Sequence, residues 1–135
     1  MALTADRDTK KRDGKTFNAP VAASSTIFAG ALVARDASGN LVPGAVATTL
    51  KKAGRAKESV DNSAGSAGDL TCDYETGCFA FKNSASSDEI TKADIGNDCY
   101  IVDDETVAKT SDTDSRSVAG QVVDVDAYGV WVLFK

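Results

Sequence analysis

The stretch from Val118 to Phe134, VAGQVVDVDAYGVWVLF, decides the fold because it predicts two β-strands joined by a tight turn. The turn falls at residues 126–129, where Asp and Gly tolerate the unusual φ/ψ values that tight turns need. Ahead of the turn, Val123 and Val125 alternate with two aspartates, and this period of two is typical of a half-buried strand. The sequence therefore predicts a terminal β-hairpin with these two valines on one face.

The second strand of this hairpin is apolar on both faces. Val130, Val132 and Phe134 share one face, whereas Trp131 and Leu133 share the other. A strand of this kind must bury both faces, either under its own chain or against another subunit. Two interpretations of Trp131 and Leu133 stay open: ordinary core residues, or a subunit interface, where large apolar and aromatic residues concentrate.

The rest of the chain consists of short apolar runs between turns rich in Gly, Ser, Asn and Asp, a pattern that favours many short strands. One helical turn is expected at 90–95, where Thr91 and Asp94 have the spacing of a capping box and Gly96 ends the turn. Exposed loops are expected at 58–68, 83–89 and 110–117. Strands are expected at 21–36, 41–42 and 45–56, in a hairpin over 69–82 with its turn at 75–77, and at 98–104, continuing past a kink to 109.

Three of these segments, at 30–36, 96–103 and 120–126, share one layout of Gly, an apolar pair and then Asp. Glycine permits a bend or a close approach between strands, and Asp caps the turn at the exit. The layout predicts an all-β fold, a small β-barrel or a jelly-roll-like β-sandwich. A length of 135 residues suits one domain, which we place at 20–135.

Residues 1–19 have no hydrophobic period and predict an extended N-terminal arm, with Leu3 and Phe17 as possible anchors. Residues 1–15 carry a net charge of +2, which leaves −7 on the rest of a chain whose total is −5. A basic arm on an acidic body can dock on an acidic protein surface, and a loose, solvated tail is the alternative. The bases of the arm are Arg7, Lys10, Lys11, Arg12 and Lys15.

Several functions lack the residues they need. The chain has no His, so a Ser or Cys nucleophile has no imidazole base, and we expect no enzyme activity. Cys72 and Cys78 lie too far apart for a zinc knuckle, and with Cys99 they are expected to be buried, reduced thiols. We expect no cofactor and no metal. An acidic body argues against nucleic-acid binding, and no apolar run is long enough to span a membrane.

Acidic residues are the remaining candidates for chemistry. The densest group, at 103–105 with Asp112 and Asp114, has oxygen ligands for a divalent cation but no EF-hand spacing, so a solvated face is expected. Asp124 and Asp126 share a strand face, yet nothing in the sequence marks the pocket that acid–base catalysis needs. Nearby Lys109 and Arg116 are expected to be surface residues that form weak ion pairs.

Three stretches resemble the decoration, or cement, proteins of tailed bacteriophages. They are STIFAGALVARDASGNLVPG at 25–44, ADIGNDCYIVDDETVAKT at 93–110 and AGQVVDVDAYGVWV at 119–132, and the similarity covers roughly residues 20–134. It lies in patterns of the form AGxLV…D…G, IGxxxYxxDdxTVa and G.V.dvd..GVwV. The match is one of layout, and it contains no catalytic motif.

The resemblance implies a compact β-domain with a terminal arm, made in the bacterial cytoplasm and carried on the outside of the virion capsid. It implies two partners: the major capsid protein, whose neighbouring subunits it would hold together, and itself, as a homodimer or homotrimer. The interface candidates are then the five bases of the arm with Phe17, Trp131 and Leu133. The alternatives are a tail-tube, head-completion or fibre-base subunit and, from another class, an enzyme or a glycan-binding module that uses the acidic loop.

Overall fold

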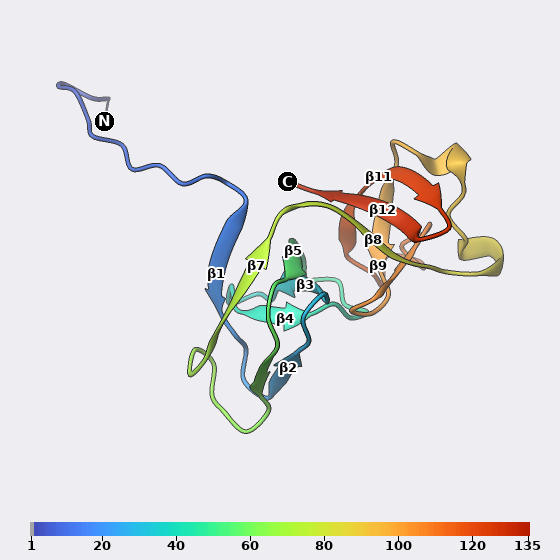
Figure 1. The fold of residues 1–135 in the computed structure, drawn as a ribbon, viewed down its shortest axis with the longest axis horizontal. Coiled ribbons are helices and arrows are strands. Elements are labelled where there is room, and N and C mark those ends of the chain that lie inside the picture. The colour runs from blue at the N-terminus through green and yellow to red at the C-terminus, as the bar shows by residue number, and fades with distance from the viewer. Residues whose placement is uncertain (1) are drawn as a thin grey trace.

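The structure is a computed structural model that describes residues 2–135. It is all-β, as expected, and Figure 1 shows its strands in two main groups. The first group is a five-stranded antiparallel sheet in the order β1-β7-β5-β3-β4. Its strands are β1 (Thr16–Pro20), β3 (Leu32–Arg35), β4 (Leu41–Pro43), β5 (Lys51–Ala56) and β7 (Thr71–Glu75).

The second group is a closed barrel in the order β10-β8-β12-β11-β9, which confirms the barrel alternative. A short parallel pairing between β8 and β10 closes the ring, and the other pairings are antiparallel. Closure leaves the barrel no free strand edge. Its strands are β8 (Gly77–Asn83), β9 (Asp98–Ile101), β10 (Thr106–Ala108), β11 (Val118–Asp126) and β12 (Gly129–Phe134).

The remaining elements are small. Strands β2 (Ser25–Ile27) and β6 (Val60–Asn62) form a two-stranded sheet, so the loop expected at 58–68 contains a strand. Asn62 within it is buried, and its Nδ2 donates to the carbonyls of Ala22 and Ser66 at 3.0 Å. Two 3₁₀ turns are η1 (Ser86–Asp88) and η2 (Lys92–Asp94), and η2 has the predicted capping box between Thr91 and Asp94. No helix within residues 2–135 is long and apolar enough to cross a bilayer.

The terminal hairpin is confirmed, with one correction. Strands β11 and β12 pair from Asp126 and Gly129 at the turn back to Gln121 and Leu133. A β-bulge between Val122 and Asp124 shifts the register, so Val122 is buried in the core and Val123 is exposed. The prediction that Val123 and Val125 share one face is wrong because the extra residue reverses the alternation.

The hairpin expected over 69–82 does not form. Strand β7 pairs with β1 and β5, whereas β8 pairs with β12 and β10, so the chain passes from the sheet to the barrel at Thr76.

Two further strands differ from the prediction. The kink expected after Asp104 is instead a turn, across which β9 and β10 pair antiparallel. The strand expected at 45–56 is shorter than predicted and begins at Lys51. At Leu50, just before it, the backbone N–H donates to Ser117 Oγ and not to a neighbouring strand.

Two hydrophobic clusters fill the fold. One lies in the sheet and includes Val33 and Leu41, while the other lies in the barrel and includes Phe81 and Phe134. Leu32 of β3 belongs to the barrel cluster, although its neighbour Val33 belongs to the sheet cluster. Alternating residues of β3 therefore connect the two parts, because successive side chains on a strand point to opposite faces.

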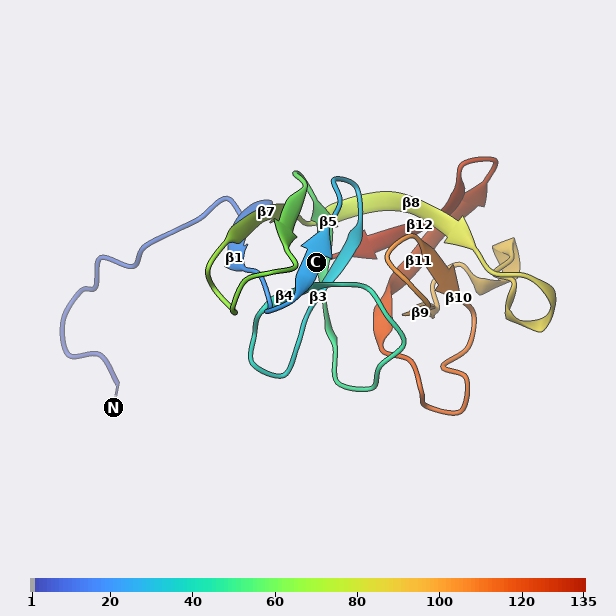
Figure 2. The same cartoon turned by 90° about the horizontal axis from the view of Figure 1, so that it is seen from below.

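The N-terminal segment ends earlier than predicted. Residues 2–15 are exposed and form no strand, and both views show them leading away from the sheets on the side opposite the barrel (Figure 1, Figure 2). Residues 16–19, which were expected in the arm, belong to β1 because they pair with β7. We keep the name N-terminal segment for residues 2–15.

Candidate interaction surface

The barrel has an apolar strip on its outside, formed by β8 and β12. Cross-strand pairing places Leu133 opposite Cys78 and Trp131 opposite Ala80, and directly opposed residues share a face. Cys78 is exposed and the other three residues are half-buried. Trp131 and Leu133 thus lie side by side as predicted, and their face is not fully covered by the described chain. We call Cys78, Ala80, Trp131 and Leu133 the outer apolar face.

Local contacts hold the largest side chain of this face in place. The indole Nε1 of Trp131 donates to Asp126 Oδ2 at 2.9 Å, so its polar atom is already satisfied. The ring of Tyr128, which is 81% exposed, meets the indole edge-on at 6.5 Å between centroids. A pre-oriented aromatic side chain loses little conformational entropy when a partner covers it.

Charged residues border the outer apolar face. Asp124 lies opposite Trp131 in the β11–β12 register and accepts from Lys92 Nζ at 3.4 Å. The pKa of Asp124 is lowered, first by the backbone N–H of Val125 and then by Lys92, so its carboxylate is ionised at neutral pH. An apolar centre with a charged border is the usual anatomy of a protein–protein interface.

Two contacts to Thr76 attach the base of the N-terminal segment to the junction of sheet and barrel. The Thr76 N–H donates to the Lys15 carbonyl at 2.8 Å, and its hydroxyl donates to the Gly14 carbonyl at 2.9 Å. Thr76 directly precedes β8, two residues before Cys78. The base of the N-terminal segment and Cys78, at one end of the outer apolar face, therefore both lie near this junction.

The predicted bases lie where solvent and a partner can reach them. Arg7, Lys10, Lys11, Arg12 and Lys15 are all exposed. Lys10 pairs with Asp8 at 2.7 Å and Arg7 donates to the Thr9 hydroxyl, both within the segment itself. Phe17, expected as an anchor for the arm, is instead half-buried against Tyr74 in the sheet.

The acidic candidates are not gathered into a site. Residues 103–105 form the β9–β10 turn, whereas Asp112 and Asp114 lie in the loop before β11. Within the described chain, no three Asp, Glu, Cys or His side chains are arranged to hold a metal ion. Burial raises the pKa of Asp104, and the carboxylates of Asp103 and Glu105 add to this effect. Asp124 and Asp126 bind Lys92 and Trp131, respectively, and do not act as a pair.

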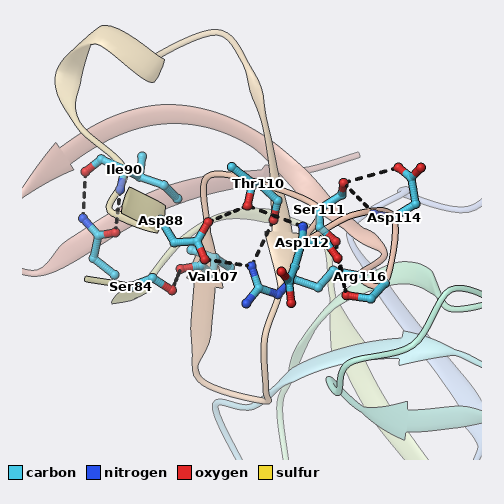
Figure 3. A network of polar contacts seen from close by, with 11 residues as sticks. Ser84, Asp88, Ile90, Val107, Thr110, Ser111, Asp112, Asp114 and Arg116 are labelled. Carbon is cyan, nitrogen blue, oxygen red and sulfur yellow. Dashed lines mark hydrogen bonds and ion pairs between the residues drawn. The ribbon is translucent and has the colours of Figure 1, made fainter. Parts of the chain in front are cut away.

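Arg116 has a different environment from the one predicted. Its side chain is 13% exposed, and its Nη1 donates to Asp88 Oδ2 at 3.3 Å and to the Thr110 carbonyl at 3.1 Å (Figure 3). The Thr110 hydroxyl donates to the same Asp88 carboxylate, and this bond is the main reason why the pKa of Asp88 is lowered. This network orders the loop before β11. The sequence offered no signal for it, because Asp88 and Arg116 are far apart along the chain.

The cysteines also differ from the prediction in one respect. All three are free, and Cys72 and Cys99 are buried as expected. Cys78 is exposed and lies on the outer apolar face.

Comparisons with protein-family models, with curated proteins and with solved structures gave no match to this chain.

Proposed function

We propose that this chain is a non-enzymatic structural protein of a tailed-bacteriophage virion. It binds the outer surface of the icosahedral capsid and bridges neighbouring major capsid protein subunits. The observation that carries the proposal is the junction at Thr76, where a basic, exposed segment starts beside an incompletely covered apolar face. The N-terminal segment is exposed, and the outer apolar face is not fully covered by the described chain. Two such surfaces suit a protein that contacts more than one neighbour.

Each element has a distinct role in this proposal. The N-terminal segment lies across a capsid subunit, becomes ordered on binding, and matches its bases to acidic groups of the shell. The outer apolar face packs between copies of the chain, in a homodimer or a homotrimer. Trp131 supplies the central contact, because buried aromatic side chains dominate interface energies. Several weak contacts on one shell add up through avidity.

The test of the segment uses a chain that begins at Asp13. It lacks Arg7, Lys10, Lys11 and Arg12 but keeps the two carbonyls that bond Thr76. We expect this variant to fold, to keep its oligomeric state and to fail to co-sediment with expanded capsids of the same phage. A variant with Lys57→Gln and Lys135→Gln loses charge elsewhere and should still bind. Undiminished binding of the truncated chain would contradict the role of the segment.

The test of the outer apolar face compares two aromatic positions, the half-buried Trp131 and the exposed Phe28. Trp131→Ser removes the centre of this face, whereas Phe28→Ser removes a ring that is 63% exposed outside it. We expect the first change to dissociate the oligomer, measured by light scattering, and to reduce decoration of capsids. The second should do neither. A ring-forming oligomer in isolation would favour a tail-tube or head-completion subunit instead.

A further inference from the structure

A basic depression lies where the sheet meets the barrel, far along the chain from the N-terminal segment. It has a volume of about 530 Å³ and lies between the start of β5 and the start of β11. Its lining includes Lys51, Lys52 and Arg116, with Leu50 and Val118 as apolar residues. A depression of this size suits a small ligand or a few residues of a peptide.

The two lysines of this depression have no counter-charge. Within residues 2–135, neither ammonium group forms an ion pair, whereas Lys82, Lys92 and Lys109 each do. Lys51 lies directly opposite Arg35 in the β3–β5 register, and like charges in that position destabilise a sheet. The end of β5 therefore carries an uncompensated positive charge on a chain whose net charge is −5.

Arg116 forms a fixed wall of the depression. Asp88 and the Thr110 carbonyl hold its Nη1, and its Nε is buried without a hydrogen-bond partner. Because Asp88 balances the charge of Arg116, the net charge of the depression comes from the lysines. Leu50 N–H is also occupied, since it donates to Ser117 Oγ, so it cannot serve an anion.

We propose that this depression binds an acidic peptide segment of another protein subunit, one with two neighbouring carboxylates. Two flexible ammonium groups suit separate carboxylates, while Leu50 and Val118 contact the aliphatic parts of the segment. A phosphate site would use converging backbone N–H groups or a free arginine fork. Here the Leu50 N–H and the Arg116 Nη1 are already engaged. The proposal is independent of capsid binding, because any acidic subunit satisfies it.

The test titrates the ¹⁵N-labelled full-length chain with the blocked peptide Gly-Glu-Glu-Gly at low ionic strength. We expect saturable shifts of the amide resonances of Leu50, Ser117 and Val118. The double variant Lys51→Gln/Lys52→Gln should bind the peptide about tenfold more weakly, as expected for the loss of two exposed charge contacts. Added salt should weaken binding to the unmodified chain.

Two controls make the result specific. The variant Lys57→Gln/Lys135→Gln removes the same charge from two exposed lysines that also lack an ion pair in the described chain, and it should bind the peptide like the unmodified protein. The neutral blocked peptide Gly-Gln-Gln-Gly should leave the three amides unmoved. Equal weakening in both lysine variants would overturn the proposal, as would inorganic phosphate moving the same amides at lower concentration than the acidic peptide.

Discussion

The ring of Phe17 in β1 stacks on the ring of Tyr74 in β7, with 5.6 Å between centroids and 25° between planes. Arg35 lies over the same tyrosine ring at 5.6 Å and donates from Nη2 to its hydroxyl at 2.9 Å. Phe17 thereby fixes the first strand to the sheet. The stack marks the boundary between the folded body and the N-terminal segment, and it gives the first prediction.

Phe17→Ala should lower the free energy of unfolding by about 2 kcal/mol, less than the loss for a fully buried Phe because this ring is half-buried. Leu3→Ala removes an apolar side chain that is 72% exposed and should change the free energy by less than about 0.5 kcal/mol. Urea unfolding of both variants, followed by tryptophan fluorescence, measures the difference. If Phe17→Ala lowered the free energy of unfolding as little as Leu3→Ala, the Phe17 ring would contribute little to the stability of the sheet.

Gly54→Ala should be among the most destabilising single changes. A Cβ at Gly54 would collide with the backbone carbonyl of Glu75 in the neighbouring strand β7, so the two strands would have to separate. Overpacking of this kind costs about 1–3 kcal/mol. Gly14→Ala is the comparison, because it has a φ of +79° but open space around it, and should cost about 1 kcal/mol. Thermal unfolding that ranks Gly14→Ala as the worse change would contradict this geometry.

Cys78 should be the cysteine that reacts in the native protein. Burial raises the pKa of Cys72 to about 11 and that of Cys99 to about 12, so both thiols stay protonated and shielded at pH 8. Burial also raises the pKa of Cys78, and the carboxylate of Asp124 adds to it, so its reaction should be slower than that of a free thiol. Titration with a chromogenic disulfide should find one reactive thiol in the folded chain that is not assembled into an oligomer and all three in denaturant. Fast reaction of Cys99 would show that the barrel opens.

The reaction of Cys78 with the same reagent also tests the proposed interface between copies of the chain. If copies of the chain pack on the outer apolar face, Cys78 should be protected in the oligomer and reactive in the Trp131→Ser variant. Reaction at the same rate in both would place the interface elsewhere on the molecule.

Asp88 should make the stability of the protein depend on pH. Its pKa is lowered in the folded state, chiefly by the Thr110 hydroxyl and also by Arg116, so the unfolded chain takes up the proton more readily. The stabilisation is therefore present above the ordinary aspartate value of 3.8 and is lost as the pH falls through the lower folded value. The free-energy difference between wild type and Asp88→Asn should be largest at neutral pH and should narrow in acid.

Thr110→Val separates the hydroxyl from the ion pair in this network. It removes the largest cause of the lowered Asp88 pKa and leaves Arg116 in place, so the midpoint of acid unfolding should move to higher pH. Urea unfolding across a pH series measures both variants. A wild-type–variant difference that does not change with pH would show that Asp88 titrates alike in the folded and unfolded chains.

Local signals in the sequence were sufficient where neighbouring residues make the structure. The turn between Asp126 and Gly129 and the capping box of Thr91 and Asp94 depend on residues a few positions apart, and both are present. The bulge at Val123 could not be predicted. One extra residue in a strand gives no compositional signal, and the alternation on either side of it looks regular.

Part of the candidate site can also be predicted from local patterns in the sequence. The alternation of β12 placed Trp131 and Leu133 together on a face that the described chain does not fully cover. The sequence does not predict Cys78 and Ala80 on that face, because they lie there only through the pairing of β8 with β12. Arg116 is not the surface residue that the sequence predicts, because its partner Asp88 comes from a distant loop.

The sequence by itself determined the all-β class, the terminal hairpin and the basic N-terminal segment, since each depends on composition or on contacts between near neighbours. Only the tertiary structure decided that β7 and β8 part at Thr76, that β8 and β10 close the barrel, and that the segment starts beside the outer apolar face. Those arrangements depend on which strands pair across long separations. That choice follows from the packing of the whole chain, which no local pattern encodes.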